Sequence, residues 1–184
     1  MNRCRWESAL PEGDDLHFSR MVILVAACLL ASGCDGSSNS VSESAKQAES
    51  NKALVARFYS DVFVEWDRAL VDELLSPDFR SHDWPEDFRA GPDGFWDFYD
   101  GVLSAFPDTR YVVDDLISEG DRVVVHWRLL ATQQGEFYGM GPTGTPISLQ
   151  GIAIYRVEDS KLMERWVVYD LHGLIEQVKA ASAD

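Results

Sequence analysis

The sequence predicts an α+β fold, with helices packed on one face of a curved sheet. Two observations carry this prediction. Apolar residues recur at helical spacing between positions 54 and 106, and from Thr109 onward they alternate with a period of two. Helices that precede a run of strands are typical of α+β domains. The chain has 184 residues, of which 46% are hydrophobic, and this suits a single core.

Three helices are expected before the strands. The first covers about 54–63, where apolar residues repeat every fourth position beside a second apolar row. Asp67 is a fair N-cap for a second helix at 68–75. A third begins at the Gly-Pro pair of 91–92 and ends at Pro107. These helices would bury their apolar stripes against the sheet.

Four strands and one last helix follow. Short turns at 119–121 and 158–160 separate the strands, so we expect an antiparallel meander. The expected strands are 109–118, 122–132, 147–157 and 161–170, and the helix is 171–180. The stretch 79–85, between the second and third helices, is expected to be extended and loop-like.

The segment 139–144, GMGPTG, matches the dinucleotide-binding pattern G-x-G-x-x-G letter for letter. That pattern holds a pyrophosphate only where it follows a strand and opens a helix. Here a strand follows instead, and Pro142 has no backbone N–H to offer. We interpret the glycines as positive-φ positions of a long hairpin loop, and expect no nucleotide.

Charge and histidine spacing exclude two classes of function. Lys and Arg number 16 against 31 Asp and Glu, a net charge of -15, and no basic run exists, so nucleic acid is not expected as a partner. His82, His126 and His172 lack metal-ligand spacing, and no cysteine pair accompanies them. We therefore expect neither a metal nor another cofactor.

The first 44 residues differ from the rest. Residues 21–33 form an apolar run that is too short to span a bilayer, which needs about 20 residues, but suits the core of a secretory signal. Leu30 to Cys34 (LASGC) resembles a bacterial lipobox, which implies cleavage after 33 and lipidation of Cys34. The alternative is a buried N-terminal helix with a chance cysteine.

This interpretation divides the chain into four parts. They are a signal peptide at 1–33, a lipidated cysteine with a flexible tether at 34–46, a domain at 47–180 and a tail at 181–184. The expected location is the cell envelope, anchored to the membrane through Cys34 and facing the periplasm or the exterior. Asp35 resembles an inner-membrane retention signal. Acidic residues in 1–20, where a signal is basic, suggest a true start near Leu16 or His17.

A series of short motifs points to one family. They are 79–83 (FRSHD), 105–108 (AFPD), 119–123 (EGDRV), 135–137 (GEF), 142–144 (PTG) and 164–166 (ERW), followed by Asp170, Gly173-Leu174 and Gln177. With the three helices and four strands, they resemble the SnoaL-like polyketide cyclases and the broader ester cyclase group, over 51–178. The resemblance implies the cone-shaped fold of the nuclear-transport-factor-two-like superfamily.

The resemblance also implies chemistry: a cofactor-free intramolecular aldol closure, in which an Asp on the last strand is the general acid and base. Asp170 matches that position. Two departures stand out: Gln133 replaces a His found in many members, and 177–179 reads QVK where QLG is usual. The first departure weakens the expectation of a complete polar site.

Candidate site residues follow from strand alternation and from the resemblance. If Trp166 points into the cone, Asp170 does too, where aromatic walls would poise a carboxyl for proton transfer; the alternative is that Asp170 caps the next helix. His82 would bind a substrate carbonyl or Asp170, with Asp83 holding its tautomer, or it would be a structural histidine.

Two further strand and loop positions complete the candidate set. Either His126 or Trp127 faces the pocket, because their side chains alternate. Phe137, in the GEF motif, is assigned to the substrate-binding set. Whether the protein is an acid-base catalyst on a polyketide-like or cyclic carbonyl compound, or a binding lipoprotein for a hydrophobic small molecule, stays open. A homodimer through the sheet is expected for either.

Overall fold

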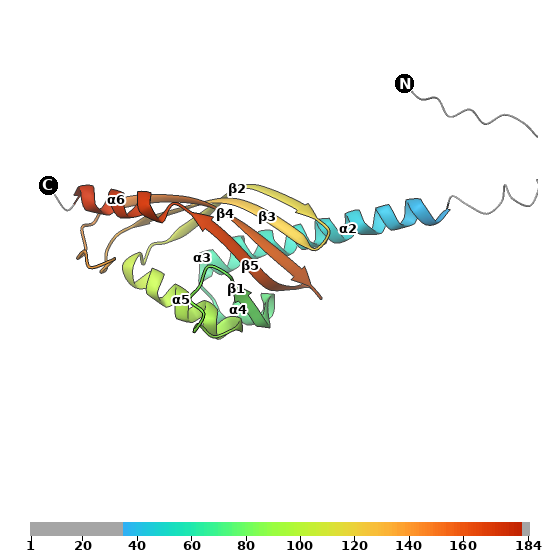
Figure 1. Ribbon diagram of the computed structural model, residues 1–184, viewed down its shortest axis with the longest axis horizontal. Helices are drawn as coiled ribbons and strands as arrows, with labels where there is room; N and C mark the ends of the chain where they lie inside the picture. The colour runs from blue at the N-terminus through green and yellow to red at the C-terminus, as the bar shows by residue number, and fades with distance from the viewer. Residues whose placement is uncertain (1–34, 182–184) are drawn as a thin grey trace, which may run out of the picture. The chain divides into compact units, whose positions relative to one another are not determined.

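Residues 35–181 are described by a computed structural model (Figure 1). The proposed signal peptide, Cys34 and most of the tail lie outside the described residues. Among the described residues, 42–181 form one compact unit. Within 35–181, no helix is both long and apolar enough to cross a membrane.

The sheet has five strands in the order β1-β5-β4-β3-β2. The four strands after β1 form the expected antiparallel meander, and they are β2 (Arg110–Glu119), β3 (Arg122–Thr132), β4 (Pro146–Glu158) and β5 (Lys161–Tyr169). The α+β prediction is confirmed.

One strand was missed in the sequence. β1 (Leu75–Ser81) pairs in parallel with β5, where the sequence predicted the end of a helix at 75 and an extended loop at 79–85. β1 is an edge strand with a single partner, and an edge strand tolerates Pro77 because one side needs no ladder donor. Local sequence there favours a turn, and pairing with β5 overrides it.

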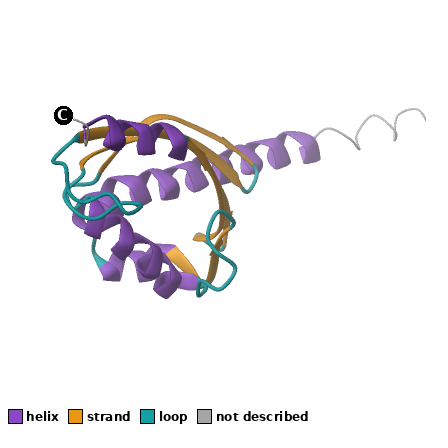
Figure 2. Ribbon diagram, turned by 60° about the vertical axis from the view of Figure 1, so that its left-hand side comes forward, coloured by secondary structure: helices purple, strands orange, loops and turns teal. Residues whose placement is uncertain are grey.

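The later turns of α2 and the helices that follow lie on the concave side of the sheet (Figures 1 and 2). The helices are α2 (Asp35–Arg57), the π-helical turn η1 (Phe58–Val62), α3 (Phe63–Glu65), α4 (Arg68–Leu74), α5 (Gly91–Ala105) and the last helix α6 (Leu171–Ala181). The Asp67 carboxylate accepts a hydrogen bond from Ala69 N at 2.9 Å, which caps α4 as expected.

The structure differs from the flexible tether expected for 34–46, because α2 is helical from Asp35. Residues such as Val55 in the later turns of α2 are buried in the core. Once those turns are packed, each residue that extends the helix loses only its own conformational entropy and gains a backbone hydrogen bond.

Strand alternation is regular in β3 and interrupted in β5. On β3, Val125 and Trp127 are buried on the concave face and His126 is exposed on the outer face. On β5, Leu162 pairs with Val157 and Glu164 with Arg156, so the strand carries one extra residue between them. This bulge places Arg165 on the same buried face as Leu162.

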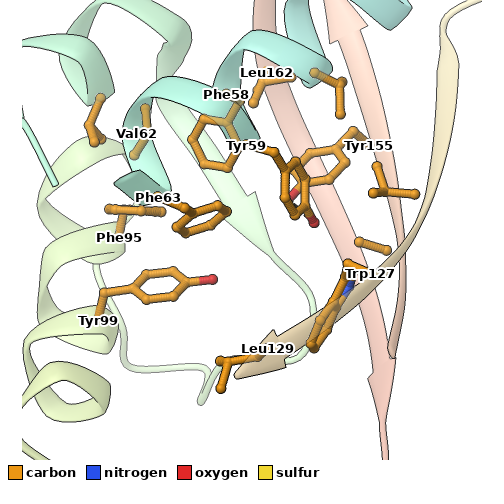
Figure 3. Packing of buried hydrophobic residues seen from close by; sticks show 14 of the residues in the cluster. Phe58, Tyr59, Val62, Phe63, Phe95, Tyr99, Trp127, Leu129, Tyr155 and Leu162 are labelled. Atoms are coloured by element: carbon orange, nitrogen blue, oxygen red, sulfur yellow. Dashed lines mark hydrogen bonds between the residues drawn. The ribbon is translucent and has the colours of Figure 1, made fainter. Parts of the chain in front are cut away.

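Aromatic rings fill the space between helices and sheet (Figure 3). Phe63 stacks on Tyr111 with ring centroids 4.2 Å apart, and Phe58 meets Phe63 edge to face at 5.0 Å. Below them in Figure 3, Tyr99 extends from α5 toward the strand that carries Trp127 and Leu129. The core therefore ends in a layer of aromatic side chains with polar tips.

Candidate functional site: an aromatic cavity with a buried ion pair

A cavity of about 280 Å³ lies between α5, α6 and the concave face of the sheet, and aromatic side chains of the core form part of its wall. That volume is close to the lower end of the roughly 300–1,000 Å³ typical of ligand pockets. Nine aromatic residues line it: Tyr59, Phe98, Tyr99, Phe106, Tyr111, Trp127, Phe137, Tyr138 and Tyr169. Aliphatic residues of β3, β4, β5 and α6, such as Leu129, Leu149, Val167 and Leu174, complete the wall. The shape and lining suit a small, flat, apolar molecule.

Two charged residues line this cavity among those that the structure describes, and they face each other. Arg165 Nη2 lies 3.7 Å from Asp83 Oδ1, with side chains that are 4% and 12% exposed. The pair is thus removed from solvent. Coulomb attraction between its charges is therefore stronger than it would be at the protein surface. Ser81 connects the two, because its hydroxyl accepts from Arg165 Nε at 2.7 Å and donates to Asp83 Oδ1.

Tyrosine hydroxyls surround this ion pair. Arg165 Nη1 donates to Tyr99 Oη at 2.8 Å, and the hydroxyls of Tyr59 and Tyr155 are 3.2 Å apart. Burial lowers the pKa of Arg165, yet the neighbouring Tyr99, Tyr155 and Asp83 raise it well above its ordinary value, so Arg165 stays cationic.

The pKa values of the buried phenols are shifted upward. Burial raises the pKa of Tyr59 and of Tyr111 well above the ordinary 10.0, and it raises that of Tyr155 to about 12. All three hydroxyls therefore keep their protons at neutral pH. Tyr59 and Tyr111, which line the cavity, therefore offer it hydroxyl groups of fixed protonation state.

The loop between β3 and β4 covers one side of the cavity. It is anchored at Gly135, whose backbone N–H donates to Ala105 O at 3.0 Å and where a Cβ would meet Ser104 O at 2.1 Å, so only glycine fits. The loop carries Phe137 and Tyr138 into the cavity wall, although Tyr138 is 67% exposed. Tyr138 and the exposed Gly101 on α5 therefore mark the mouth.

Two of the three glycines of 139–144 have the expected positive φ, and Gly141 does not. Gly139 and Gly144 have φ values of 76° and 71°, and no helix follows. The segment is a connection between β3 and β4, as the hairpin interpretation requires.

Three of the sequence candidates line the cavity: Asp83, Trp127 and Phe137. Trp127 is the alternative to His126 that the alternation left open, and it belongs to the buried face of β3. The functional roles of these three residues stay predictions.

Asp170 and Trp166 lie elsewhere, in contrast to the expectation that both point into the cone. Asp170 is exposed, and its Oδ1 accepts from Gly173 N at 2.8 Å, so it caps α6. Trp166 is on the outer face, packed between His82 and Arg122. The bulge in β5 is the physical reason, because it gives the inner face to Arg165, Val167 and Tyr169.

His82 and His126 also lie outside the cavity lining. His82 stacks on Trp166 with ring centroids 4.5 Å apart, and its Nε2 is 2.8 Å from Glu164 Oε2. His126 lies on the outer face, opposite Ile152 of β4. Neither imidazole is placed to reach a ligand held between Asp83 and Arg165.

Sequence reasoning missed Arg165 and Tyr99. A usable signal was present, because the face of β5 that holds Arg165 also holds Val167 and Tyr169, and is more apolar than the face of Glu164 and Asp170. The ion pair itself joins residues from β5 and the loop after β1, which no local pattern connects. Among residues 35–181, no three His, Cys, Asp or Glu side chains gather to hold a metal ion.

Comparisons with known proteins agree with this fold. A candidate SnoaL-like polyketide cyclase from Jannaschia sp. CCS1 is 27% identical, with a TM-score of 0.64 over 72% of this chain and 94% of that one. TsrD from Streptomyces laurentii is also 27% identical, with a TM-score of 0.64 over 72% and 96%. IdmH from Streptomyces antibioticus, a candidate polyketide cyclase, is 25% identical, with a TM-score of 0.63 over 70% and 98%.

Sequence comparison supports the same assignment. No curated protein matches the chain. The family model described as SnoaL-like polyketide cyclase matches residues 53–178, which hold all five strands, α5 and every residue of the cavity wall. The chain therefore belongs to the SnoaL-like polyketide cyclase family.

Proposed function

We propose that the chain binds a small, flat, polyketide-like carbonyl compound in its aromatic cavity, and that the Asp83 carboxylate transfers protons to and from it. The observation that carries this proposal is the buried pair of Asp83 and Arg165 in an otherwise apolar aromatic wall. The aromatic rings suit a flat ligand, and the carboxylate is the acid-base group within reach of it.

The position of Asp83 favours proton transfer. Ser81 and Arg165 hold the Oδ1 side of the carboxylate. A general base has to lie within hydrogen-bond reach of the proton it removes, and a pre-positioned base loses little freedom on reaction. Similarity to candidate polyketide cyclases supports a substrate with several carbonyl groups, in which one carbon attacks another carbonyl.

Proton exchange into a model ketone tests this function. The probe is 2-tetralone, an aromatic ketone with acidic C1 protons, incubated with the protein in D₂O and followed by proton NMR. We expect exchange faster than the buffer rate, loss of that enhancement in Asp83→Asn, and retention in Asp170→Asn. If the faster exchange is retained in Asp83→Asn and lost in Asp170→Asn, Asp170 rather than Asp83 is the acid-base residue.

A binding role without catalysis is the second candidate. Tyr138 stands at the mouth of a cavity that is small and mostly apolar, which suffices for holding a hydrophobic molecule. In that case 2-tetralone would bind, as measured by quenching of tryptophan fluorescence, and its exchange would stay at the buffer rate. Trp127 in the wall provides the fluorescence signal.

We propose in addition that the protein is a lipoprotein anchored through Cys34. The support is the apolar run 21–33 that ends at a small-residue lipobox with Cys34. Expression in a bacterium fed with labelled palmitate should label the protein in the membrane fraction, and Cys34→Ser should abolish the label. Label on Cys34→Ser, or unlabelled full-length wild type, would contradict the anchor.

A further inference from the structure

We infer that Tyr99 and Arg165 form an oxygen anchor, which receives a carbonyl oxygen of the ligand and stabilises the negative charge on that oxygen when Asp83 removes a neighbouring proton. The inference rests on the proposed function and assigns its substrate class: a ketone with a proton on the carbon next to the carbonyl. Neither residue was among the candidate site residues, although Arg165 belongs to the ERW motif at 164–166.

The hydrogen bond between the two residues makes Tyr99 a strong donor. Arg165 Nη1 donates to Tyr99 Oη at 2.8 Å, so the phenol oxygen accepts from a charged group and the phenol keeps its own O–H as a donor. Chains of hydrogen bonds polarise one another, and a donor that accepts from a cation is strengthened. Tyr99 lines the cavity, which puts this donor in contact with a ligand.

The guanidinium adds charge at the same place. Arg165 Nη2 is 3.7 Å from Asp83 Oδ1, which is longer than a hydrogen bond, so a ligand oxygen can accept from Nη2 without displacing a short bond to Asp83. Arg165 itself is held by Ser81 and Tyr99 on two other nitrogens. Its charge is thus fixed in position before the ligand enters, as electrostatic stabilisation requires.

Base and anchor are adjacent because one guanidinium holds both. Nη1 contacts Tyr99, and Nη2 faces Asp83. A carbonyl oxygen between Tyr99 and Arg165 would therefore place its neighbouring carbon beside the Asp83 carboxylate. Enolisation needs the anchor and the base this close together, because the carbonyl oxygen of a ketone and the carbon that carries the acidic proton are only two bonds apart.

Atoms and electrons balance in the proton transfer and in the ring closure that follows it. Asp83 takes the proton, the C–H electron pair forms a C=C bond, and the carbonyl π electrons move to the oxygen at the anchor. In ring closure, the C=O bond re-forms while the former C–H carbon bonds to a second carbonyl carbon. The oxygen of that second carbonyl takes the proton from Asp83, which leaves the protein unchanged.

Two probes of equal shape test the anchor. They are 2-acetylnaphthalene and 2-isopropenylnaphthalene, in which CH₂ replaces the carbonyl oxygen, and their Kd values are measured by equilibrium dialysis. We expect the wild type to bind 2-acetylnaphthalene at least about tenfold more tightly than 2-isopropenylnaphthalene. A tenfold ratio corresponds to the free energy of about one hydrogen bond to a charged group. Comparing the two probes within one protein cancels any effect of a mutation on cavity shape.

Variants then show which residues cause the preference for the ketone. Tyr99→Phe and Arg165→Met should each reduce the ratio of the two Kd values toward one, with circular dichroism to verify their fold. Arg128→Met is the matched control, because Arg128 is ion-paired with Asp114 at 2.7 Å on the outer face of the sheet. The carbonyl stretch of bound 2-acetylnaphthalene, measured by infrared difference spectroscopy, should lie lower in the wild type than in Tyr99→Phe.

The outcomes separate this inference from the proposed function. Equal binding of the two probes by the wild type, or a ketone preference that survives both variants, overturns the anchor and leaves the cavity as a ligand site. If neither probe binds the wild type, the cavity proposal fails and the anchor fails with it. If Arg165→Met is unfolded, Tyr99→Phe with its infrared shift decides the matter.

Discussion

The side chain of Gln133 holds Thr143 across the loop between β3 and β4. Gln133 Oε1 accepts from Thr143 N at 2.6 Å and from Thr143 Oγ1 at 2.5 Å, while Nε2 donates to Gly135 O at 2.5 Å and to Gly141 O at 3.0 Å. Both donors and both acceptor sites of a fully buried amide are thus satisfied. The residue organises the loop that forms one wall of the cavity.

Replacing Gln133 with leucine should therefore destabilise the protein by about 3 kcal/mol, because buried backbone groups of the loop lose their partners. Urea denaturation followed by circular dichroism measures the loss. Gln134→Leu is the matched control at the neighbouring exposed position, and it should change stability little. Equal effects of the two substitutions would show that Gln133 does not organise the loop.

Gly101→Leu should close the cavity without damaging the fold. Gly101 lies inside α5, lines the cavity, and a Cβ built on it meets no atom within 4 Å. We expect the Kd of 2-acetylnaphthalene to rise by more than about tenfold, while the melting temperature holds or increases because glycine is a poor helix former.

Gly101→Ala controls for the helix effect alone, since it removes the glycine but adds only a methyl group. Its Kd should stay within about threefold of the wild-type value. Unchanged binding in Gly101→Leu would place the ligand elsewhere than in this cavity.

Glu164 should contribute pH-dependent stability. Its hydrogen bond with His82, and then that with Arg156, lowers the pKa of this carboxyl from the ordinary 4.5. A lowered folded-state pKa means stability that is present above pH 4.5 and is lost as pH falls through the folded pKa. The difference in unfolding free energy between wild type and Glu164→Gln should be positive at pH 7 and shrink below pH 4.5.

Urea denaturation at several pH values between 7 and 3 measures that difference. A difference that stays constant over the range would mean that Glu164 does not titrate with folding. Because Glu164 and His82 lie on the outer face, this variant should leave the ketone preference of the cavity intact.

The outer face of the sheet should form the expected homodimer. Ile152 and Val168 are cross-strand neighbours on β4 and β5, and they are 49% and 78% exposed. Ile154, which is 38% exposed, extends this apolar surface. A two-fold dimer pairs one patch with itself, and exposed apolar side chains are the part of a surface that gains most from burial.

Sedimentation velocity tests the dimer. The double variant Ile152→Lys and Val168→Lys should be monomeric at concentrations where the wild type is dimeric, because it places like charges at the centre of the interface. Val64→Lys is the matched control, since Val64 is 61% exposed but belongs to α3. A monomeric wild type, or an unaffected double variant, would exclude this interface.

The sequence alone was sufficient for the fold class, the family and most of the elements. Periodicity located α5 and the four strands of the meander, because burial on one face leaves a repeating pattern in the chain. The glycines of 139–144 could be assigned to a loop, because the following strand excludes a nucleotide site. Asp83 was identified as a candidate because it belongs to a family motif.

Tertiary structure decided which residues meet. β1 exists because the edge of β5 offers it backbone partners, and α2 extends to Asp35 because its later turns are packed. The extra residue in β5 reverses the alternation, which turns Asp170 and Trp166 outward and Arg165 inward. A one-residue shift exchanges the two faces of a strand, and that shift is set by pairing between distant strands.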